Sequence, residues 1–348
     1  MDRRKASWTA LKVLAVVLIV VILYVVLQRI GFRSIFRVMQ GASPGSIRSA
    51  VLLTLGAFLL SAVRWQQLIK REERKSIVAL FPIYMAGVFG NIITPGARVG
   101  GAPIRAYYMS KAFGGEKSAH LGTILTDKLG SGLVFVCLLV ASVSFVVLFV
   151  PLGLVPKIVL EGVVLFLIAA VVGGFVVQKR MGPKSRLLAR LLPVVYNSAL
   201  LKFVRRRFAT YQLFENYAIR KLDNVLTPIA QAAGSPKALA KIIFISGASW
   251  ALLYMAHFVL FVGLGARIGL LQVIVIVTIA DFLGDISVSP GGAGFMEAAM
   301  IGLCAAFGVN AQTAAAVTLV SRGVFYLCGL GVGGLCLGVL TGLYGRQK

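Results

Sequence analysis

The residues of this chain that could do chemistry are charged side chains inside or beside long apolar runs. They are Arg64, Arg105, Asp127, Lys128, Asp281, Asp285, Glu297 and Arg322. A charge that faces lipid at mid-depth costs about 3 kcal/mol on insertion scales, so these groups must face one another or water. Arginine presents a planar pair of donors that matches a phosphate or carboxylate. The pattern therefore predicts a buried site for an anionic group.

The acidic residues leave two interpretations open. Asp281 and Asp285 are four residues apart, so they share one face of a helix. They could bind a coupling proton or cation, or they could balance Arg322 in a structural ion pair. We assign Asp127, Asp281 and Asp285 to this group of coupling or ion-pair residues. Glu297 opens a helical segment, where an acid favours the helix dipole.

Two apolar segments are interrupted in a way that a simple membrane crossing is not. Segment 77–112 is broken at Pro95-Gly96, and segment 269–308 is broken at Pro290-Gly291-Gly292. Proline removes a backbone donor and glycine permits unusual dihedrals, so each break ends one half-helix and begins another. Half-helices expose N–H groups and a positive dipole end within the membrane.

The interrupted helices and the charged residues near them together define the predicted substrate site. Its residues are Arg64, Asn91, Pro95, Gly96, Arg105, Lys128, Pro290, Gly291, Gly292, Glu297 and Arg322.

Composition places the chain in the membrane. Apolar residues make up 59% of its 348 positions, charged residues make up 14%, and the mean hydropathy is +0.91. A soluble domain carries about 25% charged residues, and a bilayer crossing needs about 20 apolar ones. We expect an all-α protein with six full spans, at 10–28, 49–69, 119–150, 157–178, 239–264 and 314–343.

The order of spans and interrupted segments predicts an inverted repeat. Residues 49–178 and 239–343 each contain a helix, a re-entrant hairpin and a helix, and the crossings give the two halves opposite orientation. Between them, residues 179–238 form a strongly basic segment that we interpret as a cytoplasmic loop. Both termini are then cytoplasmic, in a multi-pass protein of a prokaryotic plasma membrane.

Residues 29–48 fit this topology least well. They should lie outside, yet they carry Arg29, Arg33, Arg37 and Arg48. An interfacial helix that faces lipid phosphates would explain them. The rival interpretation is that the first span has the opposite orientation.

Other function classes receive little support from the sequence. The formal net charge is +25, but we find no folded nucleic-acid-binding module. His120 and His257 are isolated, and the four cysteines have no metal-binding spacing. We therefore expect no metal, no cofactor, no nucleic acid and no catalytic activity.

Three stretches and one arginine resemble the pattern of one known family, and the resemblance covers nearly the whole chain, about residues 10–345. They are GNIITPGARVGGAPIRAYYM at 90–109, LTDKLG at 125–130, SVSPGGAGFMEAAM at 287–300, and Arg322. This pattern is similar to the lysylphosphatidylglycerol synthase transmembrane-region family, also called flippase-like. At 127–128 the chain has Asp-Lys where the resemblance leads us to expect Glu-Arg.

The resemblance implies lipid transport between membrane leaflets. Bacterial members accompany a soluble aminoacyl-transferase and move aminoacylated phosphatidylglycerol. Some archaeal relatives accompany a glycosyltransferase that acts on polyprenyl phosphate. We expect a stand-alone member that takes an anionic phospholipid or a lipid-linked sugar, with a separate synthase or glycosyltransferase as its partner. The alternatives are a small-solute or ion transporter, an intramembrane lipid-modifying enzyme, and a non-transporting partner subunit.

Overall fold

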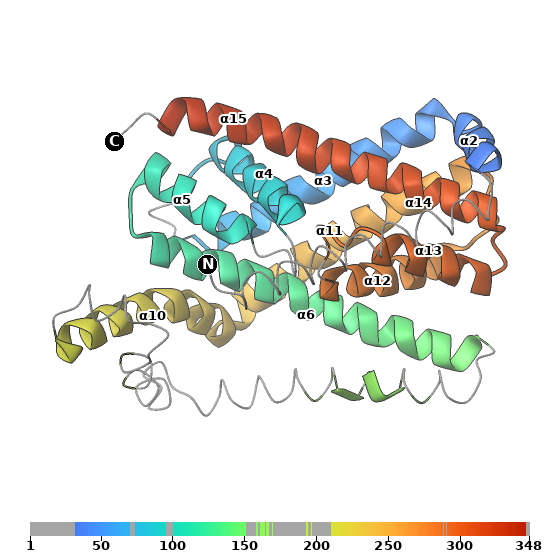
Figure 1. Ribbon diagram of the computed structural model, residues 1–348. Coiled ribbons are helices and arrows are strands. Elements are labelled where there is room, and N and C mark those ends of the chain that lie inside the picture. The colour runs from blue at the N-terminus through green and yellow to red at the C-terminus, as the bar shows by residue number, and fades with distance from the viewer. Residues whose placement is uncertain are drawn as a thin grey trace, which may run out of the picture.

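The computed structural model describes residues 32–69, 74–94, 100–150, 210–287, 289 and 291–345, with isolated positions between 158 and 196. Throughout these ranges the regular structure is helical (Figure 1). The predicted span 10–28 lies outside them, and so does most of the predicted span 157–178.

Four helices within these ranges are long and apolar enough to cross a membrane. They are α3 (Pro44–Gln67), α6 (Lys117–Phe149), α11 (Pro236–Gly263) and the continuous helix Ala311–Tyr344. Their ends agree with the predicted spans to within about five residues. The start of α3 is set by Ser43, whose side chain accepts a hydrogen bond from the Ser46 N–H, followed by Pro44 at the first helical position.

The last of these helices is not uniform. It consists of α14 (Ala311–Tyr326), the π-helix η3 (Leu327–Val332) and α15 (Gly333–Tyr344). Helix α4 (Ile77–Ile93) approaches closely at this point, because a Cβ atom on Gly333 would lie 2.7 Å from the Met85 carbonyl oxygen. Single-turn π segments are frequent at functional sites.

The first interrupted segment forms two short helices, α4 and α5 (Gly101–Phe113). The 17 residues of α4 extend about 25 Å, which is less than the ~30 Å hydrocarbon core. The side-chain Oδ1 of Asn91 accepts a hydrogen bond from the Gly101 N–H at 2.9 Å, so the end of α4 holds the start of α5. The contact requires glycine, since a Cβ on Gly101 would lie 2.1 Å from the Gly87 carbonyl oxygen.

The second interrupted segment has the same organisation. Helices α12 (Leu270–Ile286) and α13 (Phe295–Ala306) are joined by a turn in which Gly291, Gly292 and Gly294 have positive φ. This backbone conformation strains any other residue. A Cβ on Gly292 would also lie 2.8 Å from the Gly284 Cα, so the turn packs directly on α12.

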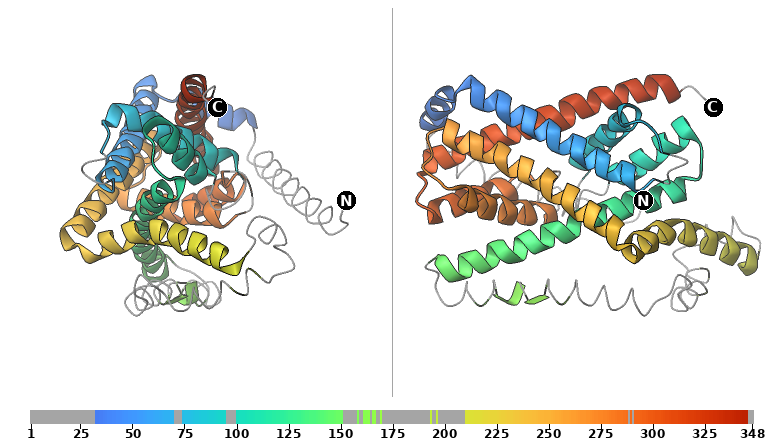
Figure 2. Two further views of the ribbon diagram at one scale, coloured as in Figure 1. Left: turned by 90° about the vertical axis from the view of Figure 1, so that its left-hand side faces the viewer. Right: turned by 180° about the vertical axis from the view of Figure 1, so that it is seen from behind.

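Each pair of short helices packs against one of the long helices (Figures 1 and 2). Helix α3 packs along α11, the first short pair contacts α15 through α4, and the second contacts α6 through α12. The largest apolar core lies among α3, α4, α11, α12, α13 and α14. A second core surrounds Trp65 of α3, between α4, α5 and α6.

Helix α2 (Phe32–Gln40) lies where we predicted an interfacial helix. Ile35 is buried in the core, whereas Arg33 and Arg37 are exposed and Phe36 keeps 60% of its surface. This division into one apolar contact and a basic outer face is that of an amphipathic helix.

The last part of segment 179–238, which we interpreted as a cytoplasmic loop, is helical. Residues Tyr211–Gly234 form helix α10, which packs on α6 and α11. Thr210 caps its first turn, and the α10 backbone approaches so closely that a Cβ on Gly122 would lie 2.6 Å from the Asn224 carbonyl oxygen. The interpretation of this segment as a loop rests on its overall positive charge and takes no account of a helical pattern in residues 211–234.

Polar contacts fix α10 at the start of α6. The Glu116 carboxylate accepts hydrogen bonds from Lys221 Nζ and Asn224 Nδ2, each at 2.7 Å, and from Ser118 Oγ at 3.1 Å. The bond from Lys221, then that from Ser118, hold the pKa of Glu116 below its ordinary value of 4.5. A carboxylate whose pKa is lower in the folded state stabilises the fold above the ordinary value, and this contribution is lost as pH falls through the folded pKa.

We predict that acid loosens α10. A nitroxide attached at Tyr217→Cys should be immobile at about pH 7 and gain mobility as pH falls below 4.5. Electron paramagnetic resonance measures this change. With Glu116→Gln the label should be mobile at both pH values, and identical spectra for the two proteins across the titration would contradict the role of Glu116.

Candidate functional site

The first buried charge cluster joins three helices through one carboxylate. Arg64 of α3, Arg105 of α5 and Asp127 of α6 are 3%, 5% and 2% exposed. Arg64 Nε donates to Asp127 Oδ1 at 2.7 Å, and Arg64 Nη1 donates to Ser246 Oγ of α11 at 3.2 Å. Arg105 Nη1 and Nη2 both donate to Asp127 Oδ2 at 3.2 Å. These three side chains carry two positive charges and one negative charge.

Two aromatic rings lie against the Arg105 guanidinium. Its Cζ lies 4.0 Å from the ring centroid of Trp65 and 4.8 Å from that of Tyr84. Trp65 is itself fixed, because its Nε1 donates to Thr123 Oγ1 at 3.1 Å. Buried Arg105 Nε has no acceptor among the described groups. Arg105 is therefore held in place with one donor unused.

In the second cluster the acid lies on the short helix and the arginine on the long helix that follows it, which is the reverse of Arg105 and Asp127. Glu297 of α13 and Arg322 of α14 are both buried, and Arg322 Nε lies 2.6 Å from Glu297 Oε1. The Nε–H is not directed for a hydrogen bond, so charge attraction holds the pair. Arg322 Nη2 donates to the Gly291 carbonyl at 2.8 Å and to the Tyr326 hydroxyl at 2.6 Å, and Nη1 contacts Met296 Sδ. Arg322 thus fixes the turn of the second hairpin.

Glu297 also caps its own helix. Its Oε2 accepts a hydrogen bond from the Gly294 N–H at the start of α13. The position of Glu297 at this helix start was predicted from the sequence, whereas its pairing with Arg322 was not. Asp281 and Asp285 lie on α12 and are half-buried, so their assignment as coupling or ion-pair residues stays a prediction.

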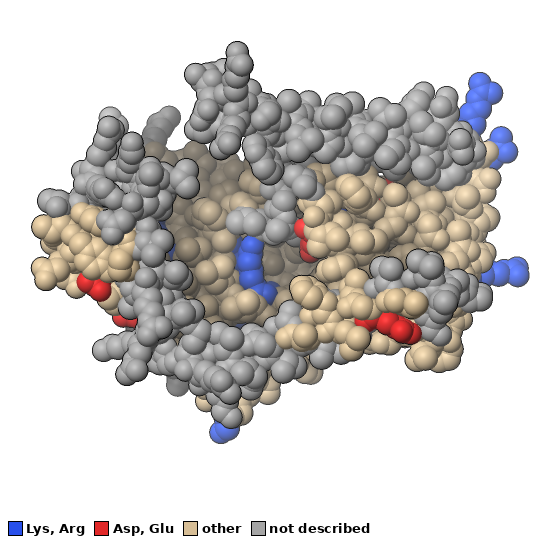
Figure 3. Space-filling model, turned by 60° about the horizontal axis from the view of Figure 1, so that its bottom comes forward, with Lys and Arg blue, Asp and Glu red and all other residues tan. Residues whose placement is uncertain are grey.

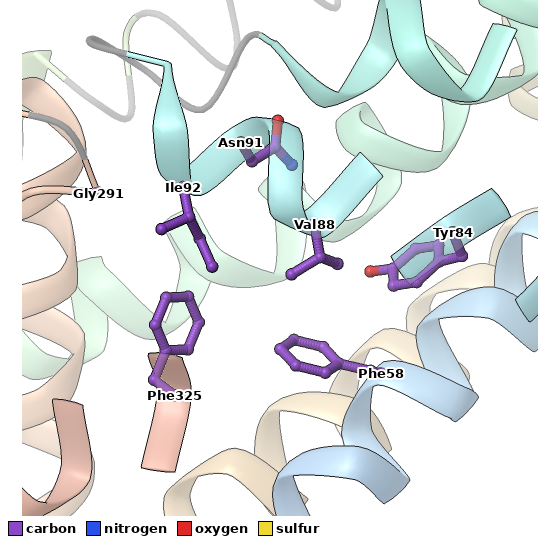
Figure 4. A pocket seen from close by; sticks show the side chains of 7 residues that line it. All are labelled: Phe58, Tyr84, Val88, Asn91, Ile92, Gly291 and Phe325. Atoms are coloured by element: carbon purple, nitrogen blue, oxygen red, sulfur yellow. The ribbon is translucent and has the colours of Figure 1, made fainter. Parts of the chain in front are cut away.

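A cavity lies where the two hairpins meet. Its volume is about 120 Å³, and it is lined by Phe58, Tyr84, Val88, Asn91, Ile92, Gly291 and Phe325 (Figure 4). Ile92 lies in the last turn of α4, and Gly291 belongs to the turn before α13. A Cβ on Gly291 would lie 3.6 Å from the Ile92 carbonyl oxygen. Tyr84 lines this cavity and its ring also contacts Arg105, whereas Gly291 lines it and its carbonyl accepts a hydrogen bond from Arg322. The cavity is thus bounded by residues that contact both clusters.

Most predicted site residues converge on these two clusters and the cavity. Asn91 and Gly291 line the cavity, Gly292 packs in the turn, and Lys128 is half-buried beside Asp127 on α6. The predicted Pro95, Gly96 and Pro290 lie outside the described residues.

Sequence reasoning missed the aromatic and hydroxyl partners of the arginines. They are Trp65, Tyr84, Ser246, Phe325 and Tyr326. Tyr326 follows Arg322 by four residues, a spacing that could have identified it.

The described surface is hollowed on one face. In that view a Lys or Arg side chain lies inside the hollow and an acidic one lies at its edge (Figure 3). Within the described ranges, no three His, Cys, Asp or Glu side chains gather as metal ligands would. The chemistry that these side chains offer is the recognition of a charged group.

Comparisons with known proteins match almost the whole chain. The model of the family described as "Lysylphosphatidylglycerol synthase TM region" matches residues 12–333. A UPF0104 membrane protein of Methanothermobacter thermautotrophicus is 23% identical over 318 residues, covering 90% of this chain and 89% of its own. Another from Pyrococcus horikoshii is 23% identical over 318 residues, covering 89% and 92%. One from Methanocaldococcus jannaschii is 24% identical over 320 residues, covering 90% of both.

We predict that Arg322 and Glu297 are strongly coupled. Arg322→Gln leaves the buried Glu297 carboxylate without its cation and should lower the free energy of unfolding by about 3–5 kcal/mol. Adding Glu297→Gln should recover much of the loss, because a glutamine oxygen can still accept from the Gly294 N–H. Reversible unfolding in mixed micelles measures both values.

If the losses in free energy of unfolding caused by the two single substitutions simply added in the double variant, this pairing would be contradicted. The same cycle with Asp285→Asn in place of Glu297→Gln tests whether that acid also balances Arg322.

Proposed function

Because the chain belongs to the lysylphosphatidylglycerol synthase transmembrane-region family, we propose that this multi-pass membrane protein moves an anionic lipid between leaflets. The substrate is an anionic phospholipid or a polyprenyl-phosphate-linked sugar, and the protein transports it without chemical change. The observation that carries the proposal is the excess positive charge of the first cluster. Arg105 lies there with an unused donor, one aromatic ring away from the cavity.

An inverted repeat is part of this proposal, and the contacts between the helices support it. The two halves place equivalent elements in equivalent contacts: α3 lies against α11, α4 against α15 and α12 against α6. The buried ion pairs lie at equivalent positions but with opposite signs, since Arg105 of α5 pairs with Asp127 of α6, whereas Glu297 of α13 pairs with Arg322 of α14. We propose that the two short helix pairs are re-entrant hairpins whose tips meet near mid-membrane, where transporters built from inverted repeats bind substrate.

The cavity suits the junction between a headgroup and its hydrocarbon chains. Phe58, Val88, Ile92 and Phe325 supply apolar surface, whereas Tyr84 and Asn91 supply polar atoms. The Asn91 Oδ1 is occupied by the Gly101 N–H, so its NH₂ group is the donor that it can offer to a ligand. A lipid phosphate near Arg105 would leave the apolar lining to the first part of its chains.

The proposal extends to the setting of the protein. We place it in a prokaryotic plasma membrane with cytoplasmic termini, where the segment around α10 is strongly basic and positive residues favour the inner side. Its lipid would be made by a separate enzyme, a soluble synthase or a glycosyltransferase.

Reconstitution tests this function directly. The protein is placed in liposomes that contain headgroup-labelled lipids, and the fraction of label accessible from each side is followed in time. Movement of an anionic lipid that exceeds protein-free liposomes supports the proposal. Flux of a small anion with no lipid movement would overturn it in favour of a small-solute transporter, and a chemically altered lipid would do so in favour of an enzyme.

We predict that Arg105 sets the rate in this assay. Arg105→Ala should lower transport by about 10- to 100-fold, the value of a charge-assisted hydrogen bond. Arg105→Lys keeps the charge but loses the planar pair of donors, so it should retain intermediate activity. Arg74→Ala, an exposed arginine before α4, serves as the control. Full activity of the alanine variant at position 105 would remove this residue from the substrate site.

A further inference from the structure

We propose that Asp127 is a built-in substitute for the ligand: it occupies Arg105 in the absence of substrate and gives way to the substrate's anionic group. This inference rests on the proposed function, because it assigns the ligand to the same arginine. It adds an exchange step that links ligand binding to the release of the first hairpin.

The two arginines hold Asp127 unequally. Arg64 Nε makes a 2.7 Å hydrogen bond to Oδ1, a length typical of a strong charge-assisted bond. Arg105 directs both Nη1 and Nη2 at the single oxygen Oδ2, each at 3.2 Å, so it lacks the parallel two-oxygen geometry that makes such pairs strong. Arg105 is therefore the exchangeable partner, and Arg64 is the permanent one.

The charge balance of the cluster supports exchange. Two guanidinium groups and one carboxylate share a nearly dry environment with one positive charge in excess. An anion on Arg105 leaves two separate neutral pairs, Arg64 with Asp127 and Arg105 with the ligand. Because an unbalanced buried charge is costly, a ligand with one negative charge stabilises the cluster where a neutral ligand does not.

The surroundings allow Arg105 to change partners without moving far. Trp65 and Tyr84 both lie against its guanidinium, and neither contact involves Asp127. Arg64 keeps its second bond to Ser246 of α11, so Asp127 stays compensated after Arg105 has left. The exchange then removes the ion pair between α5 and α6, which frees the first hairpin to move when substrate binds.

The second cluster lacks these properties. Arg322 and Glu297 form a one-to-one pair, and the Arg322 nitrogens Nη1 and Nη2 already contact Met296, Gly291 and Tyr326. Its role is to fix the turn of the second hairpin, so exchange is specific to the first.

A binding experiment on the purified full chain in detergent tests the exchange. The probe is glycerophosphoglycerol, a soluble phosphate diester with one negative charge, and its dissociation constant is measured by calorimetry. Asp127→Asn removes the internal competitor and should bind the probe about tenfold more tightly than the wild type, within the usual range of coupling between sites. Glu116→Gln removes one exposed acid just before the same helix and should bind like the wild type.

A second measurement uses the unmodified protein, since Asp127→Asn leaves two buried arginines without an acid and could prevent folding. Saturation with the probe should speed amide hydrogen exchange in α5 and leave α13 unchanged. Slower exchange in α5, an Asp127→Asn affinity equal to or below that of the wild type, or no probe binding at all would overturn the inference.

The liposome assay separates this inference from the proposed function. Lipid transport with unchanged probe affinity in Asp127→Asn would overturn the exchange alone. Tighter probe binding without any lipid transport would overturn the proposed function and leave Asp127 as the competitor for an anion.

Discussion

The constraint on which this structure depends is that a charge placed in an apolar interior must have a partner there. Asp127 meets it for the first half of the molecule, because one carboxylate binds guanidinium groups from α3 and α5. Through Arg64 the same cluster reaches Ser246 of α11, so four helices are fixed relative to one another. Breaking a buried pair of this kind costs about 3–5 kcal/mol, a large share of a typical folding free energy of about 5–15 kcal/mol. Glu297 and Arg322 do the same for the second hairpin, with the signs reversed.

Glycine makes this arrangement of charges possible. A short helix can turn back inside the bundle only where its partner approaches closely, as Gly101 does at Gly87 and Gly292 does at Gly284. The positive φ angles of the second turn are open to glycine at little cost. With both hairpins folded back, Ile92 and Gly291 meet, and the cavity forms where their tips join. Movement of either hairpin would change the cavity, which is why an ion pair on α5 can connect binding with motion.

Within the described residues, the sequence predicted four of the six expected spans and the two pairs of short helices, but not the partners of the buried charges. Long uncharged runs and paired Pro-Gly breaks identify spans and hairpins because their physical causes are local. Which acid neutralises which arginine depends on how helices far apart in sequence pack. Glu297, 25 residues before Arg322, is its partner in the structure, and the sequence did not identify this pair. The role of Asp281 and Asp285 stays a prediction. The aromatic rings around Arg105 were missed for the same reason, since Trp65 and Tyr84 come from different helices. Helix α10 was missed because basic residues dominate its surroundings, although its packing on α6 is as close as a glycine permits.

The central claim is that both short helix pairs are re-entrant, so that each begins and ends on one side of the membrane. Single cysteines in a cysteine-free background test it with a membrane-impermeant thiol reagent. The exposed positions Arg74 and Lys117 flank the first pair, and Arg267 and Ala311 flank the second. We predict that Arg74→Cys and Lys117→Cys react with the reagent only from the cytoplasmic side. Arg267→Cys and Ala311→Cys should react only from the opposite side. If the two flanks of either pair reacted from different sides, that pair would cross the membrane, and the site between the hairpin tips could not exist.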